Sequence, residues 1–446
     1  MEEKILSLLE NKKYAELKES FTNMEAADIA ILFESVPTEK LPLLFRLLPK
    51  ELAAEVFVEL ESDMQELLIS GFSDSELKEV WEELYVDDAV DIIEEMPANV
   101  VKRILRHSDS EMRQSINEIL NYPKDSAGSI MTTEYVDLKE NMTVDDAFTH
   151  IRRTGVDKET IYTCYVTDSN RKLMGLISVK DLLLADKSAL LTDIMETNII
   201  YANTIDDKED VARQFGKYDF LAIPVVDKER RLVGIVTVDD AIDVLEEENT
   251  EDIEKMAAIT PSDKPYLKTG IFETYYKRIP WLMLLMLSAT FTGKIISSYE
   301  SALRDYAILT SFIPMLTGTG GNAGGQTSAS IIRGISLNEI AFKDIFRVIW
   351  KELRVALICG ITLSVTLFAK LILVDRIEFK IAIVVALAII SAVALAKMVG
   401  CMLPLFAKKI GFDPAVMANP LLSTMVDVVT LAVFFKIAVT VLRITI

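Results

Sequence analysis

Two stretches in the last third of the chain decide its fold: residues 318–330, GTGGNAGGQTSAS, and residues 413–427, DPAVMANPLLSTMVD. Each lies in a long apolar run, so glycines and polar side chains interrupt segments of the kind that cross a membrane. Glycines remove side-chain bulk where helices cross or where backbone lines a cavity. The first stretch does not fit a dinucleotide-binding loop, because a long uncharged run precedes it instead of a strand in a soluble βαβ unit.

Hydropathy predicts a five-helix transmembrane domain over residues 271–446. The expected spans are about residues 280–298, 306–332, 355–374, 381–407 and 414–442. With the N-terminal region inside, the inner flanks of these spans carry nine basic residues and the outer segments carry four. This bias predicts a multi-pass protein of the inner (cytoplasmic) membrane, in contact with lipid and with a cytosolic N-terminus.

Charge is distributed unevenly along the 446 residues, whose net charge is −21. Residues 271–446 hold 17 basic and 10 acidic side chains, which leaves 30 basic and 58 acidic side chains in residues 1–270. Phosphates would be repelled by such an acidic region, so the composition excludes nucleic acid as a partner. Three cysteines and two histidines form neither a disulfide framework nor a zinc-ligand spacing. The charged N-terminus is not a signal peptide.

Asp427 is the only acid deep inside a predicted span, where a carboxylate needs a cation, water or a partner. Asn419 and Ser423 precede it at intervals of four residues, so the three side chains form a polar stripe on one helix face. Such a stripe suits a cation path. The alternative is that Asp427 pairs with one of the lysines that lie in the predicted spans: Lys294, Lys370 or Lys397.

The acidic region contains two kinds of internal repeat. Residues 26–37, AADIAILFESVP, resemble residues 87–97, DDAVDIIEEMP, which predicts an all-α, solenoid-like module over residues 1–125. Two α/β units of about 60 residues follow, over residues 126–187 and 188–248. Their shared pattern of glycine, hydroxyl and aspartate recurs as Gly175, Ser178 and Asp181 and as Gly234, Thr237 and Asp240. The hydroxyl follows a strand and could cap the next helix.

The α/β units resemble tandem CBS domains. Many CBS pairs bind adenine nucleotides, so ATP or a related nucleotide at Ser178, Asp181, Thr237 and Asp240 is a further expectation from the resemblance, beside simple helix capping.

Nine carboxylates and no base lie between Asp239 and Glu254. These charges repel one another at helical spacing, so we expect either a solvated face or divalent cations that screen them, since oxygen ligands suit magnesium or calcium. The segment leads into a connecting (plug) helix predicted over residues 249–270, and from there into the first span.

The order of these parts, together with the two membrane motifs, resembles the MgtE family of magnesium channels over essentially the whole chain. The resemblance implies a homodimer with a pore between two membrane domains, and magnesium both as transported ion and as regulator. It implies an ion pathway at Asp427, Asn419, Ala415, Ser423, Gly318, Gly321 and Asn322. It also implies magnesium sensing at Asp88, Asp91, Asp207, Glu209, Asp219, Asp240, Asp243, Glu248, Glu251 and Asp252.

The functional hypothesis is a magnesium channel closed by feedback from cytosolic magnesium at the interfaces of the acidic domains. The alternative is an ion-coupled secondary transporter of divalent cations, regulated by nucleotide at the CBS pair. An enzyme is not expected, because the sequence offers no nucleophile–base pair, metal triad or phosphate loop in a suitable context.

Overall fold

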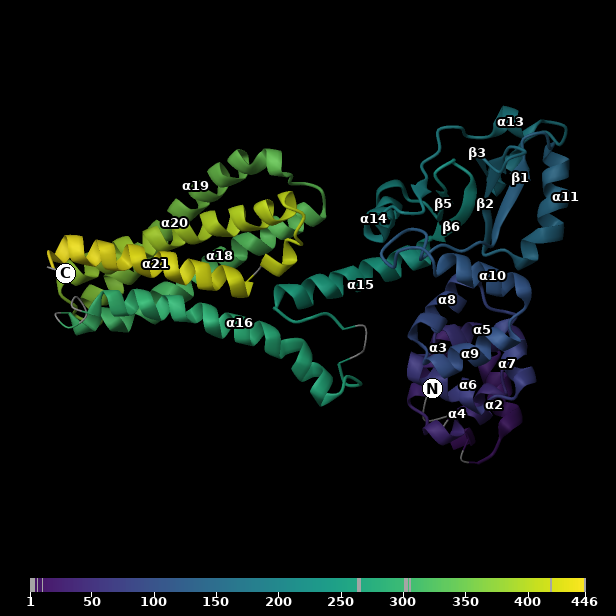
Figure 1. Ribbon diagram of the computed structural model, residues 1–446, viewed down its shortest axis with the longest axis horizontal. Coiled ribbons are helices and arrows are strands. Elements are labelled where there is room, and N and C mark those ends of the chain that lie inside the picture. The colour runs from purple at the N-terminus through teal and green to yellow at the C-terminus, as the bar shows by residue number, and fades with distance from the viewer. Residues whose placement is uncertain are drawn as a thin grey trace. The chain divides into compact units, whose positions relative to one another are not determined.

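The computed structural model describes residues 5, 7–9, 11–262, 266–300, 304, 306–417 and 419–444, with the side chains of 417 and 419 left undescribed. The chain forms two compact units, Met1–Glu246 and Glu247–Ile446 (Figure 1). The first unit contains a helical module and two α/β repeats, and the second contains long apolar helices.

Short helices build the N-terminal module. They are α2 (Tyr14–Phe21), α3 (Ala26–Glu34), α4 (Leu41–Phe45), α5 (Lys50–Val58), α6 (Ser62–Gly71), α7 (Asp74–Trp81), α8 (Val86–Glu95), α9 (Ala98–His107) and α10 (Ser110–Ile119). Helix α3 packs on α5, α5 on α7 and α7 on α9, so alternate helices stack in a row. Phe21, Phe33 and Phe57 are fully buried in the core of this stack. The predicted solenoid-like module is therefore confirmed.

Each α/β repeat forms its own three-stranded sheet. The first contains β1 (Tyr135–Lys139), α11 (Val144–Thr154), β2 (Thr160–Thr167), β3 (Leu173–Ser178) and α12 (Val179–Leu184). The second contains α13 (Leu191–Ile194), β4 (Ala202–Asn203), α14 (Lys208–Tyr218), β5 (Ala222–Val226), β6 (Leu232–Thr237) and α15 (Val238–Met256). In both sheets the first strand is parallel to the second, and the second is antiparallel to the third. The predicted duplication is confirmed.

The two repeats exchange their opening segments. Thr132, before the first sheet, bridges Ile235 in β6, and Glu196, before the second sheet, bridges Leu176 in β3. A Cβ added at Gly175 would lie 2.5 Å from Met195 Sδ, and one at Gly234 would lie 2.7 Å from Met131 Sδ. The repeated glycine therefore makes room for a methionine from the other repeat.

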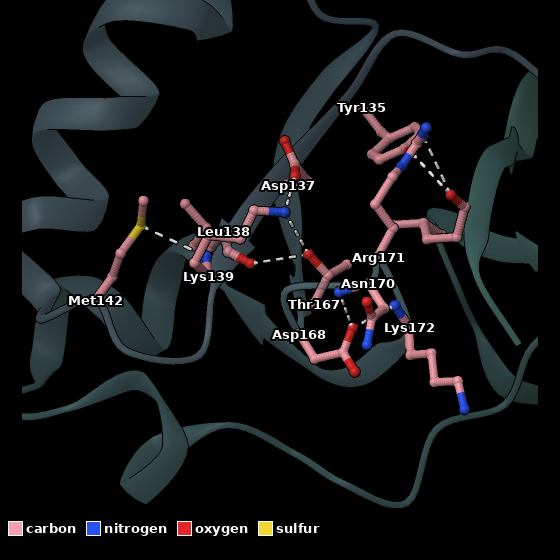
Figure 2. Close-up of polar contacts among 11 residues, drawn as sticks. Tyr135, Asp137, Leu138, Lys139, Met142, Thr167, Asp168, Asn170, Arg171 and Lys172 are labelled. Carbon is pink, nitrogen blue, oxygen red and sulfur yellow. Dashed lines mark hydrogen bonds and ion pairs between the residues drawn. The ribbon is translucent and has the colours of Figure 1, made fainter.

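A polar network joins the repeats at the turn between β2 and β3. Figure 2 shows Arg171 beside the ring of Tyr135, and the guanidinium donates to Tyr135 Oη at 3.1 Å. Tyr135 Oη in turn donates to the Leu232 carbonyl in β6 at 3.2 Å. Lys139 Nζ contacts Asp137 and Thr167, each at 2.8 Å, which ties β1 to β2. The Arg171 and Tyr135 contacts therefore hold the first α/β repeat against β6 of the second.

The second unit consists mainly of α16 (Ile271–Ser298), α18 (Ile313–Ser336), α19 (Ile345–Leu373), α20 (Phe379–Lys409) and α21 (Asn419–Leu442). Within the described residues, four helices are long and apolar enough to cross a membrane: Ile271–Ser298, Phe342–Leu373, Phe379–Lys409 and Pro420–Leu442. The five-span expectation is corrected in this respect. Helix α18 has 24 residues and is long enough to cross a membrane, but it is not among these four helices. Its glycines and polar side chains lower its mean hydropathy.

Helix α18 nevertheless packs inside the bundle. It contacts both α20 and α21, while α19 lies against α20 and α16 lies against α21. Eleven residues of α18 are buried, including Gly320, Gly324 and Gly325. Of the connecting helix predicted over residues 249–270, residues 249–256 are the C-terminal part of α15, which ends at Met256, and residues 263–265 lie outside the described residues.

Candidate functional site

Asp427 is half-buried on α21. Two of the lysines considered as its partners meet other acids: Lys397 Nζ lies 3.3 Å from Glu352 Oε2, and Lys370 Nζ lies 2.6 Å from Asp375 Oδ2. Among the residues that the structure describes, neither these lysines nor Lys294 forms an ion pair with the Asp427 carboxylate. A carboxylate placed among apolar helices without an internal cation can bind one from outside.

The glycines of α18 let this helix lie directly against α21. A Cβ at Gly321 would lie 3.6 Å from Ser423 Oγ, and one at Gly320 would lie 3.0 Å from Val426 Cγ1. Ser423 and Val426 are within one turn of Asp427 on the same helix. The structure therefore brings Gly321, Ser423 and the Asp427 region of α21 together, as an ion pathway between α18 and α21 requires.

The other predicted pathway residues lie in different surroundings. Gly318 and Asn322 are on an exposed face of α18, at a spacing of four residues. Ala415 is buried before α21, in a short 3-10 turn where its N–H donates to Asp413 Oδ1 at 2.8 Å. The Asn419 side chain lies outside the described part of the chain. Gln326 and Ser330 continue the exposed row of Gly318 and Asn322 along α18.

A cluster of carboxyl groups, which we call the acidic cluster, gathers in the first unit. It consists of four carboxyl groups with raised pKa values, Asp87, Asp88, Glu159 and Asp240, and of two neighbouring acids that help to raise them, Glu134 and Asp239. They come from α8, from the segments before β1 and β2, and from the first turn of α15. Four separate parts of the sequence thus contribute to it. The cluster lies where the helical module meets the CBS pair.

Burial is the largest cause of the raised pKa values, and repulsion between neighbouring carboxylates adds to it. The pKa of Asp88 rises to about 6, that of Asp240 to about 7 and that of Glu159 to about 8. Asp87 is only 8% exposed, and its pKa also rises well above the ordinary value. Glu159 Oε2 is buried and has no hydrogen-bond donor among the described residues. The chemistry of this donor set fits a hard divalent cation, which prefers carboxylate oxygens.

Two of the predicted sensing residues, Asp88 and Asp240, belong to the acidic cluster. Asp91 and Asp243 are exposed, about one turn further along α8 and α15, and Glu248 and Asp252 lie still further along α15. Sequence reasoning missed Glu134 and Glu159, because nothing in their local sequence separates them from ordinary surface acids. Within the described residues, no three such groups converge closely enough to hold an ion directly.

The sensing residues predicted on α14 have local partners. Asp207 caps this helix by accepting from the N–H groups of Glu209 at 3.0 Å and Asp210 at 3.2 Å. Glu209 forms an ion pair with Arg213, one turn further along the helix. Asp219 ends the helix in a left-handed conformation, with φ of 55°. Asp207 and Glu209 thus stabilise α14 through side-chain contacts, and Asp219 ends it through its backbone conformation.

Glu251 already has a cation within the protein. Lys255 Nζ lies 2.6 Å from Glu251 Oε1 and 2.8 Å from Asp413 Oδ2. The ammonium group therefore links the end of α15 to the segment that precedes α21. A divalent ion at Glu251 would compete with this lysine for the carboxylate.

The residues predicted for nucleotide binding lie at the starts of α12 and α15, where each hydroxyl contacts the aspartate three residues on. Ser178 Oγ accepts from the Asp181 N–H at 3.1 Å and donates to the Asp181 carboxylate at 2.5 Å. Thr237 Oγ1 donates to the Asp240 carboxylate at 2.6 Å. Helix capping by Ser178, predicted from the repeated pattern, is confirmed.

Apolar helices packed around a carboxylate, joined to a region with a buried acidic cluster, are the arrangement expected of a membrane transport protein for cations. Three family models match the chain: the MgtE intracellular N domain over residues 24–125, the CBS domain over residues 127–188 and 191–247, and the MgtE divalent cation transporter over residues 313–437. The chain belongs to the MgtE family.

Similar proteins extend over nearly the whole chain. The magnesium transporter MgtE of Thermus thermophilus is 37% identical over 95% of this chain and 94% of its own length. The magnesium transporter MgtE of Bacillus subtilis is 32% identical over 98% of this chain and 96% of its own length. The cytosolic domain of the Mg2+ channel MgtE, crystallised in complex with ATP, is 35% identical, with a TM-score of 0.52 over 55% of this chain and all of that domain.

Proposed function

We propose that this protein is a magnesium channel of the cytoplasmic membrane and that magnesium on the cytosolic side closes it. The observation that carries the proposal is the Asp427 carboxylate, which has no internal cation among the described residues and lies on the helix that packs against the glycines of α18. The MgtE transporters that resemble the whole chain support magnesium as the transported ion.

A single carboxylate suits magnesium for a physical reason. Magnesium gives up its water reluctantly, so a wide site with few charged ligands can hold the hydrated ion and still release it. Ser423 and the glycine backbone of α18 provide small polar surroundings for that water. Asn419, Ala415, Gly318 and Asn322 complete the proposed pathway.

The acidic cluster is the proposed sensor. The pKa values of Asp88, Asp240 and Glu159 are about 6, 7 and 8, so at neutral pH some of these groups keep a proton that cations can replace. Asp88 on α8 and Asp240 on α15 repel each other when both are charged. Neutralised carboxyl groups let the helical module and the CBS pair stay together, and charged ones favour separation. Helix α15 leads towards the first span and would carry that change to the pore.

Apolar residues on the CBS pair support a homodimer. Leu183 on α12 is 67% exposed, and Ile242, which occupies the equivalent position on α15, is 58% exposed. Large apolar side chains at matching positions of the two repeats suit a self-complementary interface, which a two-fold dimer requires. Two membrane units could then enclose a pore between them.

Adenine nucleotide at the CBS pair is a further part of the proposal. The related cytosolic domain was crystallised with ATP, which supports a nucleotide site in this chain at the repeated Ser178–Asp181 and Thr237–Asp240 pairs. Their hydroxyl–carboxylate contacts would have to share the carboxylate with a ribose.

Magnesium uptake by vesicles that contain the purified full-length chain tests the proposed function. With a dye inside that reports magnesium, Asp427→Ala is expected to lower uptake at least about tenfold, because the pathway loses its charged ligand. Asp375→Asn is the matched control, since this acid lies outside the pathway in an ion pair with Lys370. Undiminished uptake by Asp427→Ala at equal protein content would contradict the proposal. Uptake driven by voltage alone distinguishes a channel from a transporter that needs a proton or sodium gradient.

A further inference from the structure

Three helices of the membrane unit meet at a buried ion pair that the sequence did not reveal. Lys397 of α20 donates to Thr327 Oγ1 of α18 at 2.9 Å and lies 3.3 Å from Glu352 Oε2 of α19. Thr327 Oγ1 donates to the same Glu352 oxygen at 3.0 Å. The lysine and glutamate side chains are only 8% and 15% exposed. We call Thr327, Glu352 and Lys397 the buried triad.

The buried triad is not explained by stability alone. Desolvation of two charges offsets most of their attraction, and apolar residues of similar volume often stabilise a fold equally well. Ionisable residues inside a membrane domain therefore tend to serve a function. Here the closed set of hydrogen bonds allows few alternative geometries, so it fixes how α18 is rotated and shifted against α19 and α20.

The triad lies beside a close crossing of α18 and α20. A Cβ added at Gly400 of α20 would lie 2.5 Å from the Gly324 carbonyl of α18. Gly324 precedes Thr327 by three residues and Gly400 follows Lys397 by three, so crossing and triad are about one turn apart. A Cβ at Gly324 would also lie 3.4 Å from Val426 Cγ2, next to Asp427 on α21.

We propose that Lys397 is a positioning residue of the ion pathway. Through Glu352 and Thr327 it holds α18 against α20 at the level where α18 also touches α21, and so it sets the space beside Asp427. This inference rests on the proposed transport function, because it assigns the space between α18 and α21 to the passing ion.

Substitutions at the ion pair and at Thr327 test whether the buried triad positions α18 or only stabilises the fold. Lys397→Met with Glu352→Leu replaces the ion pair by apolar side chains, and we expect a folded protein whose magnesium uptake per molecule falls about fivefold. Thr327→Val removes only the hydroxyl and is expected to lower uptake in the same direction, whereas Thr327→Ser keeps the hydroxyl and restores it. The exposed pair Lys370 and Asp375 provides the control, as Lys370→Met with Asp375→Asn. Wild-type uptake by the folded double variant and by Thr327→Val would overturn the proposal.

A cysteine pair measures the position of α18 without transport. A Cβ at Gly321 would lie 3.9 Å from Ser423 Cβ, which is within the range for a disulfide. In a full-length chain whose three native cysteines are replaced by serine, Gly321→Cys with Ser423→Cys should oxidise readily. Adding Lys397→Met and Glu352→Leu should slow that oxidation about fivefold. An unchanged oxidation rate would overturn the proposal even if the wild type transports magnesium. Slower oxidation in a protein without magnesium uptake would leave the positioning role intact and count against the transport function instead.

Discussion

The surroundings of Glu159 disfavour the charged form of its carboxyl group. Burial and the nearby carboxylates of Asp239, Asp88 and Asp240 raise its pKa from an ordinary 4.5 to about 8. A carboxyl group with a raised pKa holds a proton in the folded chain that the unfolded chain releases. The protonated group therefore makes its full contribution to the free energy of unfolding below its ordinary pKa. This contribution is lost as the pH rises through the pKa that the group has in the folded chain.

Glu159→Gln should remove this pH dependence. Without divalent cations, we expect the wild-type free energy of unfolding to fall between pH 4.5 and 8. The variant should be more stable than the wild type at pH 8 by about 2 kcal/mol, discounted for partial exposure, and nearly equal to it near pH 4.5. Thermal unfolding of the full-length chain in detergent measures this. Glu140→Gln is the control, because Glu140 is exposed in the same repeat. Equal pH profiles for wild type and Glu159→Gln would contradict the burial argument.

Asp240 and Asp181 occupy equivalent positions in the two repeats but differ in surroundings. Each carboxylate accepts from the hydroxyl that precedes its helix, yet only Asp240 belongs to the acidic cluster. If the cluster binds magnesium, Asp240→Asn should raise the magnesium concentration that protects residues 239–254 from protease by about tenfold, and Asp181→Asn should not. Equal protection curves for the two variants would remove Asp240 from the proposed sensor.

At the scale of helices, the crossing of α18 and α20 depends on missing side chains. The backbones approach so closely at Gly324 and Gly400 that a methyl group from either helix meets a carbonyl oxygen of the other. Backbone cannot yield as the end of a flexible side chain can, so the helices would have to separate. This explains why α18 keeps its glycines although they lower its hydropathy.

Gly400→Ala should force α18 and α20 apart. We expect a loss of stability of about 2 kcal/mol and lower magnesium uptake, since overpacking costs energy and moves α18. Gly293→Ala is the matched control, because a Cβ there has no atom within 4 Å among the described residues. Thermal unfolding and vesicle uptake of both variants check the prediction. A Gly400→Ala protein as stable and active as Gly293→Ala would show that the crossing is looser than described.

At the scale of the whole molecule, the proposed dimer places exposed apolar residues of the CBS pair in an interface. Leu183→Arg should shift the full-length protein towards monomer, because an unpaired charge in an apolar interface is costly. Ile31→Arg is the control, since Ile31 in the helical module has the same exposure of 67%. Light scattering after size exclusion in detergent measures the mass. If the Leu183→Arg variant remains as dimeric as the Ile31→Arg variant, the dimer interface does not include Leu183.

Sequence patterns predicted the architecture well where the signal is local. Apolar periodicity located the stacked helices, and the repeated glycine, hydroxyl and aspartate located both α/β units. Hydropathy placed α16, α19, α20 and α21 to within about ten residues, and the absence of charge placed α18. Local patterns did not show which side chains form ion pairs. Lys397 was one of the lysines that the sequence offered as a partner of Asp427, but it pairs with Glu352.

By itself, the sequence determined the order of the parts, the duplication within the CBS pair and the position of one acid in an apolar helix. Those features depend on side-chain type and on periods of a few residues, which any stretch of chain carries within itself. Only the tertiary structure decided that Glu134 and Glu159 join Asp88 and Asp240, and that a lysine, a glutamate and a threonine from three helices form one contact. These contacts depend on how each helix is rotated and packed against its neighbours. Helix rotation and packing are set in turn by close contacts between residues far apart in the chain.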